Sequence, residues 1–254
     1  MGLLDPVTRP LGRAMIRYLT SDLREFQPAA TSDPEKLRAA LRPGDVLLVE
    51  GSTRVAAVIK YLTQSTWSHS ALYIGTHDGQ PHRLIEVDIE HGCITVPLEK
   101  YELQQTRICR PVGLDEAGCG TIIKFMTDRL GLAYDTRNVI DLARYLFPMP
   151  PIPQRFRRRM LALGSGDPTR AICSTLLAQA FESVQYPVLP RVSRAKANTR
   201  RRREQRREVL HIRHYSLYAP RDFDLSPYFA IIKPTIEAGF DYRSIIWRRP
   251  PKAA

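Results

Sequence analysis

The segment Ser68-His-Ser-Ala-Leu-Tyr-Ile74 begins with polar residues, becomes apolar and ends at Gly75, which predicts a strand that leads into a core. The alternation of side chains along a strand puts His69, Ala71 and Tyr73 on one face. Turn-forming residues follow at 76–81, and Arg83-Leu-Ile-Glu-Val87 predicts a second strand. We expect the two strands to form a hairpin. Pairing residue 74 with residue 81 places His69 opposite Glu86, whereas a slip by one residue would turn one of these side chains to the other face.

Further short strands are predicted on both sides of this hairpin. Three apolar runs bounded by Gly or Pro predict them, namely Val46–Val49, Gly92–Val96 and Thr106–Arg110. Apolar residues at helical spacing predict a helix over Thr53–Thr63. Residues 45–111 are therefore expected to form a meander of about five strands, with one helix inserted early.

The second half of the chain has a different pattern. Apolar spacing predicts helices over Leu114–Leu130 and Ile172–Ser183. The Pro-rich segments 147–153 and 218–229 predict irregular structure, because proline lacks a backbone N–H. Residues 10–27 have the spacing of an amphipathic helix, which either packs on the body or lies on a membrane. Strands followed by separate helices predict an α+β fold.

Cys173 lies at the start of the predicted helix over 172–183. Unpaired N–H groups and a partial positive charge at a helix N-terminus favour a thiolate and can stabilise an oxyanion. The alternative is that Cys173 is a small buried hydrophobic residue, as most free cysteines are. Four cysteines occur, and their spacing does not predict a zinc site.

His69 is the candidate base that would act on Cys173, and Glu86 is its candidate partner. A carboxylate beside an imidazole fixes the tautomer and supports the imidazolium form. If the register differs from the predicted one, Asp88, Glu90 and His91 remain alternative partners for the imidazole.

Four segments together resemble a known family: Gly44-Asp-Val-Leu-Leu-Val49, Ser68-His69, Leu84-Ile-Glu86 and Ile172-Cys-Ser-Thr-Leu-Leu-Ala178. Their order resembles the circularly permuted papain-like fold, in particular the YaeF/YiiX-like amidase group of the NlpC/P60 superfamily. The tail over 220–229 is similar to that of its lipo-like proteobacterial subgroup. The resemblance implies an antiparallel meander packed against the helix that carries the nucleophile.

The resemblance also implies roles for individual residues. Cys173, His69 and Glu86 match the family's catalytic triad, and Gly131-Leu-Ala-Tyr134-Asp135 matches a segment that walls the pocket. Tyr134 and Tyr73 are therefore candidate substrate-binding residues, although either could equally be core packing. The chain departs from the family at Thr175, where an acidic residue is common; this difference concerns substrate contacts more than chemistry.

Three regions are expected from these patterns. Residues 1–42 form an N-terminal amphipathic helix and linker, residues 43–230 form the permuted papain-like catalytic domain, and residues 231–254 form a C-terminal tail. Basic inserts are expected in the catalytic domain near 148–168 and 191–213.

The net charge of +12 is concentrated in those two inserts. Residues 191–213 carry +8 and Arg155-Phe-Arg-Arg-Arg159 carries +4, so the rest of the chain is neutral. These segments are either solvated surface or contacts for an anionic membrane surface or nucleic acid. The arginines concerned are Arg155, Arg157, Arg158, Arg159, Arg200, Arg201, Arg202 and Arg203. Nucleic acid is the less favoured partner, because residues 191–213 contain no Phe, Tyr or Trp.

The sequence thus predicts a cysteine hydrolase or amidase that acts on a peptide-type or acyl-lipid amide or ester through an acyl-enzyme, without a metal or organic cofactor. Two alternatives remain: a lipid acyltransferase with the same triad, and a non-enzymatic protein that binds anionic surfaces or nucleic acid. Because the N-terminus has no apolar signal-peptide core, we expect a cytoplasmic protein at or near the inner membrane surface.

Overall fold

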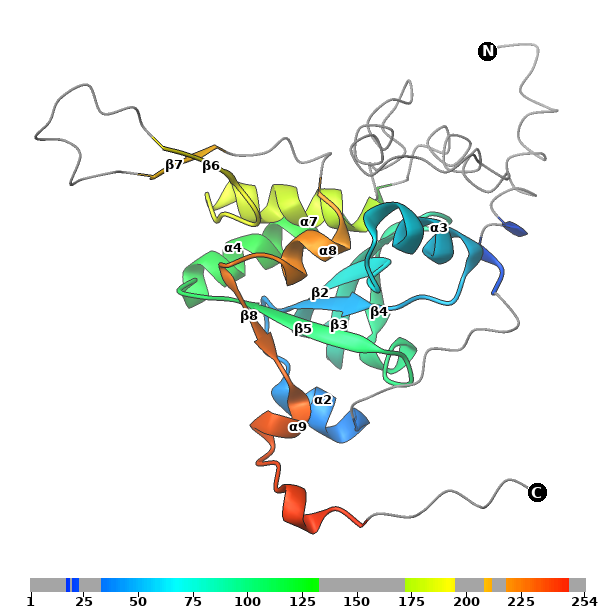
Figure 1. The fold of residues 1–254 in the computed structure, drawn as a ribbon. Helices are drawn as coiled ribbons and strands as arrows, with labels where there is room; N and C mark the ends of the chain where they lie inside the picture. The colour runs from blue at the N-terminus through cyan, green and yellow to red at the C-terminus, as the bar shows by residue number, and fades with distance from the viewer. Residues whose placement is uncertain are drawn as a thin grey trace, which may run out of the picture.

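The computed structural model describes residues 17–18, 20–22, 33–132, 172–194, 208–211 and 218–246. Its strands are β1 (Val46–Val49), β2 (His69–His77), β3 (Gln80–Asp88), β4 (Gly92–Pro97), β5 (Thr106–Pro111), β6 (Arg191–Arg194), β7 (Glu208–His211) and β8 (Phe229–Ile232). Its helices are α2 (Pro34–Ala40), α3 (Arg54–Thr63), α4 (Glu116–Thr127), α7 (Ile172–Ser183), α8 (Pro220–Asp224) and α9 (Pro234–Glu237), with short 3-10 segments η1 (Leu98–Lys100) and η5 (Tyr242–Ser244) (Figure 1).

A six-stranded antiparallel sheet is the centre of the fold, with the order β4-β3-β2-β1-β5-β8. Strand β1 lies between β2 and β5, and all four of its residues are buried, which agrees with its unbroken apolar sequence. The five strands predicted over 45–111 are present, and α3 is inserted after β1. The α+β class is therefore confirmed.

The hairpin of β2 and β3 has a different register from the predicted one. Leu72 pairs with Ile85 and Tyr73 with Leu84, so the prediction that His69 lies directly opposite Glu86 was wrong by two residues. The register shifts at Gly75, whose φ of 78° is favourable for glycine, and this irregularity was not visible in the sequence. Because the side-chain period of a strand is two residues, the error leaves His69 and Glu86 on the same face.

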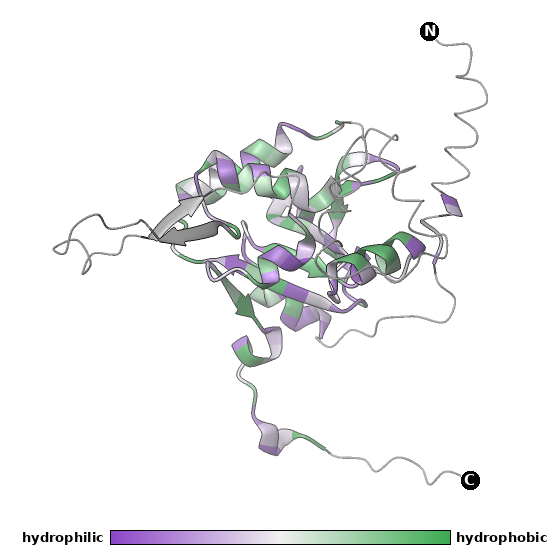
Figure 2. Ribbon diagram, turned by 45° about the horizontal axis from the view of Figure 1, so that its top comes forward, coloured by the Kyte–Doolittle hydropathy of each residue, from purple (hydrophilic) through white to green (hydrophobic). Residues whose placement is uncertain are grey.

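The sheet has a core on each face. One face carries Leu48, Leu72 and Ile85 against α4, α7 and α8, where Phe181 of α7 packs against Phe223 and Phe229. The other face carries Leu47, Ala71, Tyr73, Leu84 and Ile108 against Leu37 of α2 and Leu98 of η1. Figure 2 shows hydrophobic residues along the sheet and on the helices that cover it. Helix α7 thus holds its first turn against the sheet at β2 and β3.

Two sequence predictions for the C-terminal half were wrong. Residues 218–229 are not irregular: Pro220 begins α8, where its missing N–H costs nothing, and β8 adds to the sheet beside β5. The ends of the basic segment 191–213 pair as strands, Arg191–Arg194 as β6 and Glu208–His211 as β7. The expected boundary at residue 230 falls within β8.

The predicted helices over Thr53–Thr63, Leu114–Leu130 and Ile172–Ser183 are present as α3, α4 and α7. Thr53 caps α3 by accepting a hydrogen bond from the Ala56 N–H, and Asp115 caps α4 in the same way. Most of the predicted helix over 10–27, the Pro-rich segment 147–153, Tyr134 and the arginines at 155–159 and 200–203 lie outside the described residues. None of the helices described is long and apolar enough to cross a membrane.

Candidate active site

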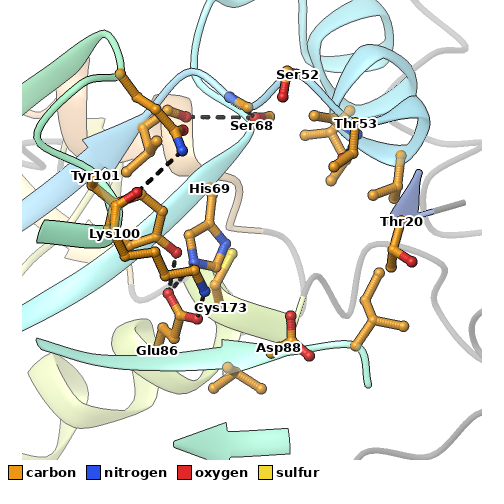
Figure 3. A pocket seen from close by; sticks show the side chains of 18 of the residues that line it. Thr20, Ser52, Thr53, Ser68, His69, Glu86, Asp88, Lys100, Tyr101 and Cys173 are labelled. Atoms are coloured by element: carbon orange, nitrogen blue, oxygen red, sulfur yellow. Dashed lines mark hydrogen bonds and ion pairs between the residues drawn. The ribbon is translucent and has the colours of Figure 1, made fainter. Parts of the chain in front are cut away.

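A cavity of about 310 Å³ opens between α3, the ends of β2 and β3, and η1. His69, Glu86 and Cys173 all line it, although they come from three different elements (Figure 3). Pairing between β2 and β3 begins at Leu72 and Ile85, so the first residues of β2 and the last residues of β3 carry the site without being paired to each other. The structure therefore brings together the three residues that the sequence selected.

His69 and Glu86 are in direct contact. The Nε2 atom of His69 lies 3.0 Å from Oε2 of Glu86, whose side chain is only 1% exposed. Since Nε2 is engaged by the carboxylate, Nδ1 is the ring nitrogen left to interact with the thiol of Cys173. Glu86 therefore fixes both the tautomer and the orientation of the imidazole.

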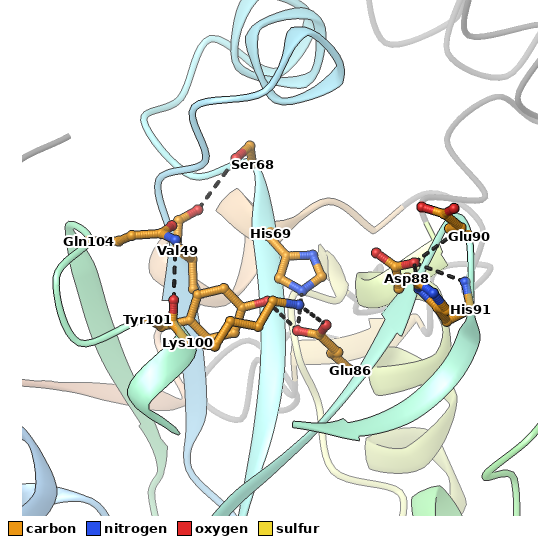
Figure 4. A network of polar contacts seen from close by, with 10 residues as sticks. All are labelled: Val49, Ser68, His69, Glu86, Asp88, Glu90, His91, Lys100, Tyr101 and Gln104. Atoms are coloured by element: carbon orange, nitrogen blue, oxygen red, sulfur yellow. Dashed lines mark hydrogen bonds and ion pairs between the residues drawn. The ribbon is translucent and has the colours of Figure 1, made fainter. Parts of the chain in front are cut away.

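Glu86 has two further partners that the sequence analysis missed. The Nζ atom of Lys100 lies 2.5 Å from Oε1 of Glu86, and the Tyr101 hydroxyl donates a hydrogen bond to Oε2 (Figure 4). Both residues follow β4 in and just after η1, at a point where the sequence gives no periodic signal. The carboxylate is thus held by three donors from two segments.

These contacts keep the Glu86 carboxyl ionised. Burial would raise its pKa, but the hydrogen bonds and positive charges of His69 and Lys100 outweigh burial and lower the pKa to about 2. The pKa of the Tyr101 hydroxyl is raised far above its usual value, by burial and then by the neighbouring Glu86 carboxylate. Tyr101 therefore stays protonated and donates a hydrogen bond to the carboxylate.

Cys173 is the second residue of α7 and is 5% exposed. Burial opposes ionisation of the thiol, but the positive charge of His69 and a hydrogen bond to it outweigh this effect, so the pKa of Cys173 is lowered. Burial also opposes the charge on His69, yet Cys173 and Glu86 raise the pKa of His69 to about 10. Both shifts favour a proton on the imidazole and an ionised sulfur on Cys173.

In their ionised forms these groups make a row of alternating charge, in the order Cys173 (negative), His69 (positive), Glu86 (negative) and Lys100 (positive). A thiolate beside an imidazolium can attack a carbonyl carbon, and the imidazolium can then protonate the leaving group. The arrangement is that of a cysteine nucleophile with a histidine acid–base and an orienting carboxylate.

The remaining walls of the cavity have two characters. Val55, Ala56 and Ile59 of α3 form an apolar wall, and Asp88 and Glu90 at the end of β3 form an acidic rim. The N-terminal segment closes one side, where Asp22 accepts a hydrogen bond of 2.6 Å from the Ser52 hydroxyl and bridges to Thr53. Arg54 of α3 makes further contacts to this segment, with Ser21 and with the ring of Tyr18.

Tyr73 is not brought to this cavity. It is 4% exposed in the core on the α2 side of the sheet, and its hydroxyl lies 2.9 Å from Nδ1 of His82. The prediction that Tyr73 contacts substrate was wrong. Tyr73 shares a face of β2 with His69, but it is four residues further along the strand and so lies in the core. Its packing alternative is the one that the structure supports.

The loop that leads into His69 is fixed by the C-terminal helix α8. Asp224 of α8 accepts hydrogen bonds from the indole N–H of Trp67 at 3.1 Å and from Arg107 at 2.6 Å. The Arg107 guanidinium also lies 4.9 Å from the centre of the Trp67 ring. Trp67 is two residues before His69, so these contacts with Asp224 and Arg107 hold the chain in place just before β2 begins.

The other cysteines are a contrast to Cys173. Burial raises the pKa of Cys93 to about 11 and raises the pKa values of Cys109 and Cys119. All four cysteines are free thiols. Within the described ranges, no group of three His, Cys, Asp or Glu side chains is placed to hold a metal ion.

The fold and this site define the chain as an α+β protein with a buried Cys–His–Glu arrangement at the ends of two interior strands of an antiparallel sheet. No protein-family model matches the chain, and no curated protein matches it. The crystal structure of the metalloprotein yiiX from Escherichia coli O157:H7 is a distant structural neighbour, at 13% identity and a TM-score of 0.47. The alignment covers 76% of this chain and 97% of that one. The likeness to yiiX concerns the fold alone.

Proposed function

We propose that this protein is a cysteine hydrolase that cleaves an amide or ester bond through an acyl-enzyme. The observation that carries the proposal is the buried contact between His69 and Glu86 at the wall of a cavity that also exposes the Cys173 thiolate. Burial is the main reason that the pKa of the structural cysteine Cys109 is raised. The pKa of Cys173 is instead lowered although this residue is buried too, which is what a nucleophilic cysteine requires.

In the proposed reaction, Sγ of Cys173 attacks the carbonyl carbon and forms a tetrahedral intermediate. The bond to the leaving nitrogen or oxygen then breaks, and the leaving group takes the proton from His69. Water attacks the resulting thioester while His69 accepts its proton, and the acid and the thiolate are released. N–H groups in the first turn of α7 are suited to stabilise the oxyanion.

The order of the site residues supports a permuted papain-like fold as part of this proposal. The histidine strand β2 precedes the cysteine helix α7 along the chain, which is the order expected for the permuted arrangement. The apolar wall formed by α3 favours an acyl group with an aliphatic part. Transfer of that acyl group to an alcohol or amine would use the same intermediate with a different acceptor.

The proposal is tested by the pH dependence of Cys173 alkylation, followed by mass spectrometry in wild type and in His69→Ala. We expect a midpoint well below the value of about 8.5 for a free cysteine, and a higher midpoint in the variant. Cys119 is the internal control, because it is half-buried and its pKa is raised. A Cys173 midpoint near the free value and independent of His69 would contradict the proposal.

A second arm tests catalysis directly. Wild type and Cys173→Ala are incubated with a panel of acyl esters and amides, with and without an alcohol acceptor. Release of free acid only by wild type supports hydrolysis, and formation of an acylated acceptor supports transfer. The absence of a trapped thioester on Cys173 with every substrate would count against the acyl-enzyme.

A further inference from the structure

Ser70 is an unusual residue beside the candidate nucleophile. Its exposed fraction is 0%, and its hydroxyl makes no hydrogen bond of ordinary geometry with any described residue. An unpaired buried hydroxyl costs stability, so its presence calls for an explanation. The proposed reaction uses Cys173, His69 and Glu86 and assigns no role to Ser70.

The position of Ser70 in the sheet directs its polar groups toward Cys173. Ser70, Leu72 and Ile74 lie on one face of β2, and Leu72 and Ile74 of this face pack in the same core as Leu177 of α7. Helix α7 packs on this face of β2 and carries Cys173 in its first turn. Ser70 pairs with Leu48 of β1, but it precedes Leu72, where pairing with β3 begins. The backbone of Ser70 on the side toward β3 therefore takes no part in the pairing of β2 with β3.

We propose that Ser70 is a positioning residue that directs its hydroxyl and its backbone N–H at the sulfur of Cys173. Two donors on one side of the sulfur hold the thiolate in one orientation, while His69 acts from another side. This inference rests on the proposed function, since it concerns the ionised thiol that the reaction requires.

The electrostatics of the thiol agree with this geometry. Burial raises the pKa of Cys173, and His69 has the largest opposing effect. Hydrogen bonds from the side chain and the backbone of Ser70 lower this pKa further. The other titratable groups that line this cavity are His69 of β2, Glu86 and Asp88 of β3, Glu90 after it, Lys100 and Tyr101 of the η1 region, and Asp22 of the N-terminal segment.

The test compares Ser70→Ala with Thr175→Val. Thr175 is the matched control, because its hydroxyl is also buried and without a partner in the described part of the chain, and it lies on α7 two residues after Cys173. At two residues' separation on a helix, Thr175 faces away from Cys173. We measure the alkylation midpoint of Cys173 by mass spectrometry and the thermal stability of each variant.

We expect Ser70→Ala to raise the alkylation midpoint of Cys173 by about one pH unit, since a hydrogen bond to a charged group is lost. The backbone N–H remains, so the rise is smaller than in His69→Ala. Thermal stability should change little, because removal of a buried polar group offsets the loss of its hydrogen bond to the sulfur. A merely structural serine would give the reverse pattern, with a change in stability and none in the midpoint.

The outcomes separate this inference from the function on which it rests. A low, His69-dependent midpoint in wild type that does not move in Ser70→Ala would overturn the role of Ser70 and leave the proposed function intact. An ordinary midpoint in wild type would overturn both. An equal rise in Thr175→Val and Ser70→Ala would also overturn the inference, because the effect would then not be specific to Ser70.

Discussion

Replacement of Glu86 by Gln tests the charged arrangement most directly, because it removes the negative charge between His69 and Lys100 with little change in volume. Burial raises the pKa of the Glu86 carboxyl, but its partners outweigh burial and bring the pKa from 4.5 to about 2. A group whose pKa is lower in the folded state binds fewer protons there. Glu86 therefore stabilises the fold above about pH 4.5, and this stabilisation is lost as the pH falls toward 2.

The size of the effect follows from that change in pKa. A fall from 4.5 to about 2 corresponds to about 3 kcal/mol of stability at neutral pH, of which about 2 kcal/mol is lost by pH 3. The conversion is appropriate because the Glu86 side chain is 1% exposed. Lys100 is 41% exposed, so solvent screens its part of the interaction.

The assay is urea unfolding of wild type and Glu86→Gln between pH 7 and pH 3. We expect the variant to be less stable at pH 7 and the difference to narrow by about 2 kcal/mol at pH 3. Glu182→Gln is the control, because Glu182 is exposed on α7 and should give a small, constant difference. A difference for Glu86→Gln that is constant across this range would refute an ionised, buried carboxylate.

Three further predictions follow from other features. Tyr101→Phe removes a buried donor to Glu86 and should lower the free energy of unfolding by about 1–3 kcal/mol and raise the alkylation midpoint of Cys173. Phe181→Ala should cost about 3–5 kcal/mol in urea unfolding, because Phe181 is 0% exposed among three other aromatic rings. Charge reversal of Arg200–Arg203 should reduce co-sedimentation with anionic vesicles, if these basic residues bind lipid as the sequence predicts.

Each of these predictions has its own control. Tyr61→Phe removes a phenol from an exposed position on α3 and should leave the Cys173 midpoint unchanged. Phe181→Leu should cost less than Phe181→Ala because it leaves a smaller cavity. Neutral vesicles, or anionic vesicles at high salt, should bind neither wild type nor the reversed variant; equal binding of both proteins to anionic vesicles would contradict the lipid prediction.

The sequence was informative where one periodicity dominated. The change from polar to apolar residues over 68–74 and the apolar run over 46–49 predicted strands that the structure contains, and the apolar spacing over 172–183 predicted α7. The hairpin register was missed because a two-residue turn at Asp78 and Gly79 closes the hairpin, with His77 paired to Gln80, whereas the prediction paired residue 74 with residue 81. The irregularity at Gly75 leaves this offset unchanged, since Tyr73 pairs with Leu84 in the same register. His69 and Glu86 still met, since an error of two residues preserves the face.

Contacts made by residues outside regular elements were not predictable. Lys100 ends a single 3-10 turn and Tyr101 follows it, and their partner Glu86 is on β3, two elements earlier in the chain. A lysine and a tyrosine in such a turn give no periodic signal, so only the path of the chain after β4 shows that they face the carboxylate. The same holds for β8, whose four residues gain their strand conformation by pairing with β5.

The charged groups of the site are best understood as one unit. Burial opposes every charge taken alone, as the effects of burial on Cys173, His69 and Glu86 show. Because the charges alternate in sign, each buried ion lies beside an opposite one, and the set stays ionised although its members are buried. Loss of one member leaves its neighbour unpaired, so the groups should lose their charges together. This coupling explains why a carboxylate that does not touch substrate can govern the reactivity of the thiol: Glu86 keeps the proton on His69, and His69 keeps it off Cys173.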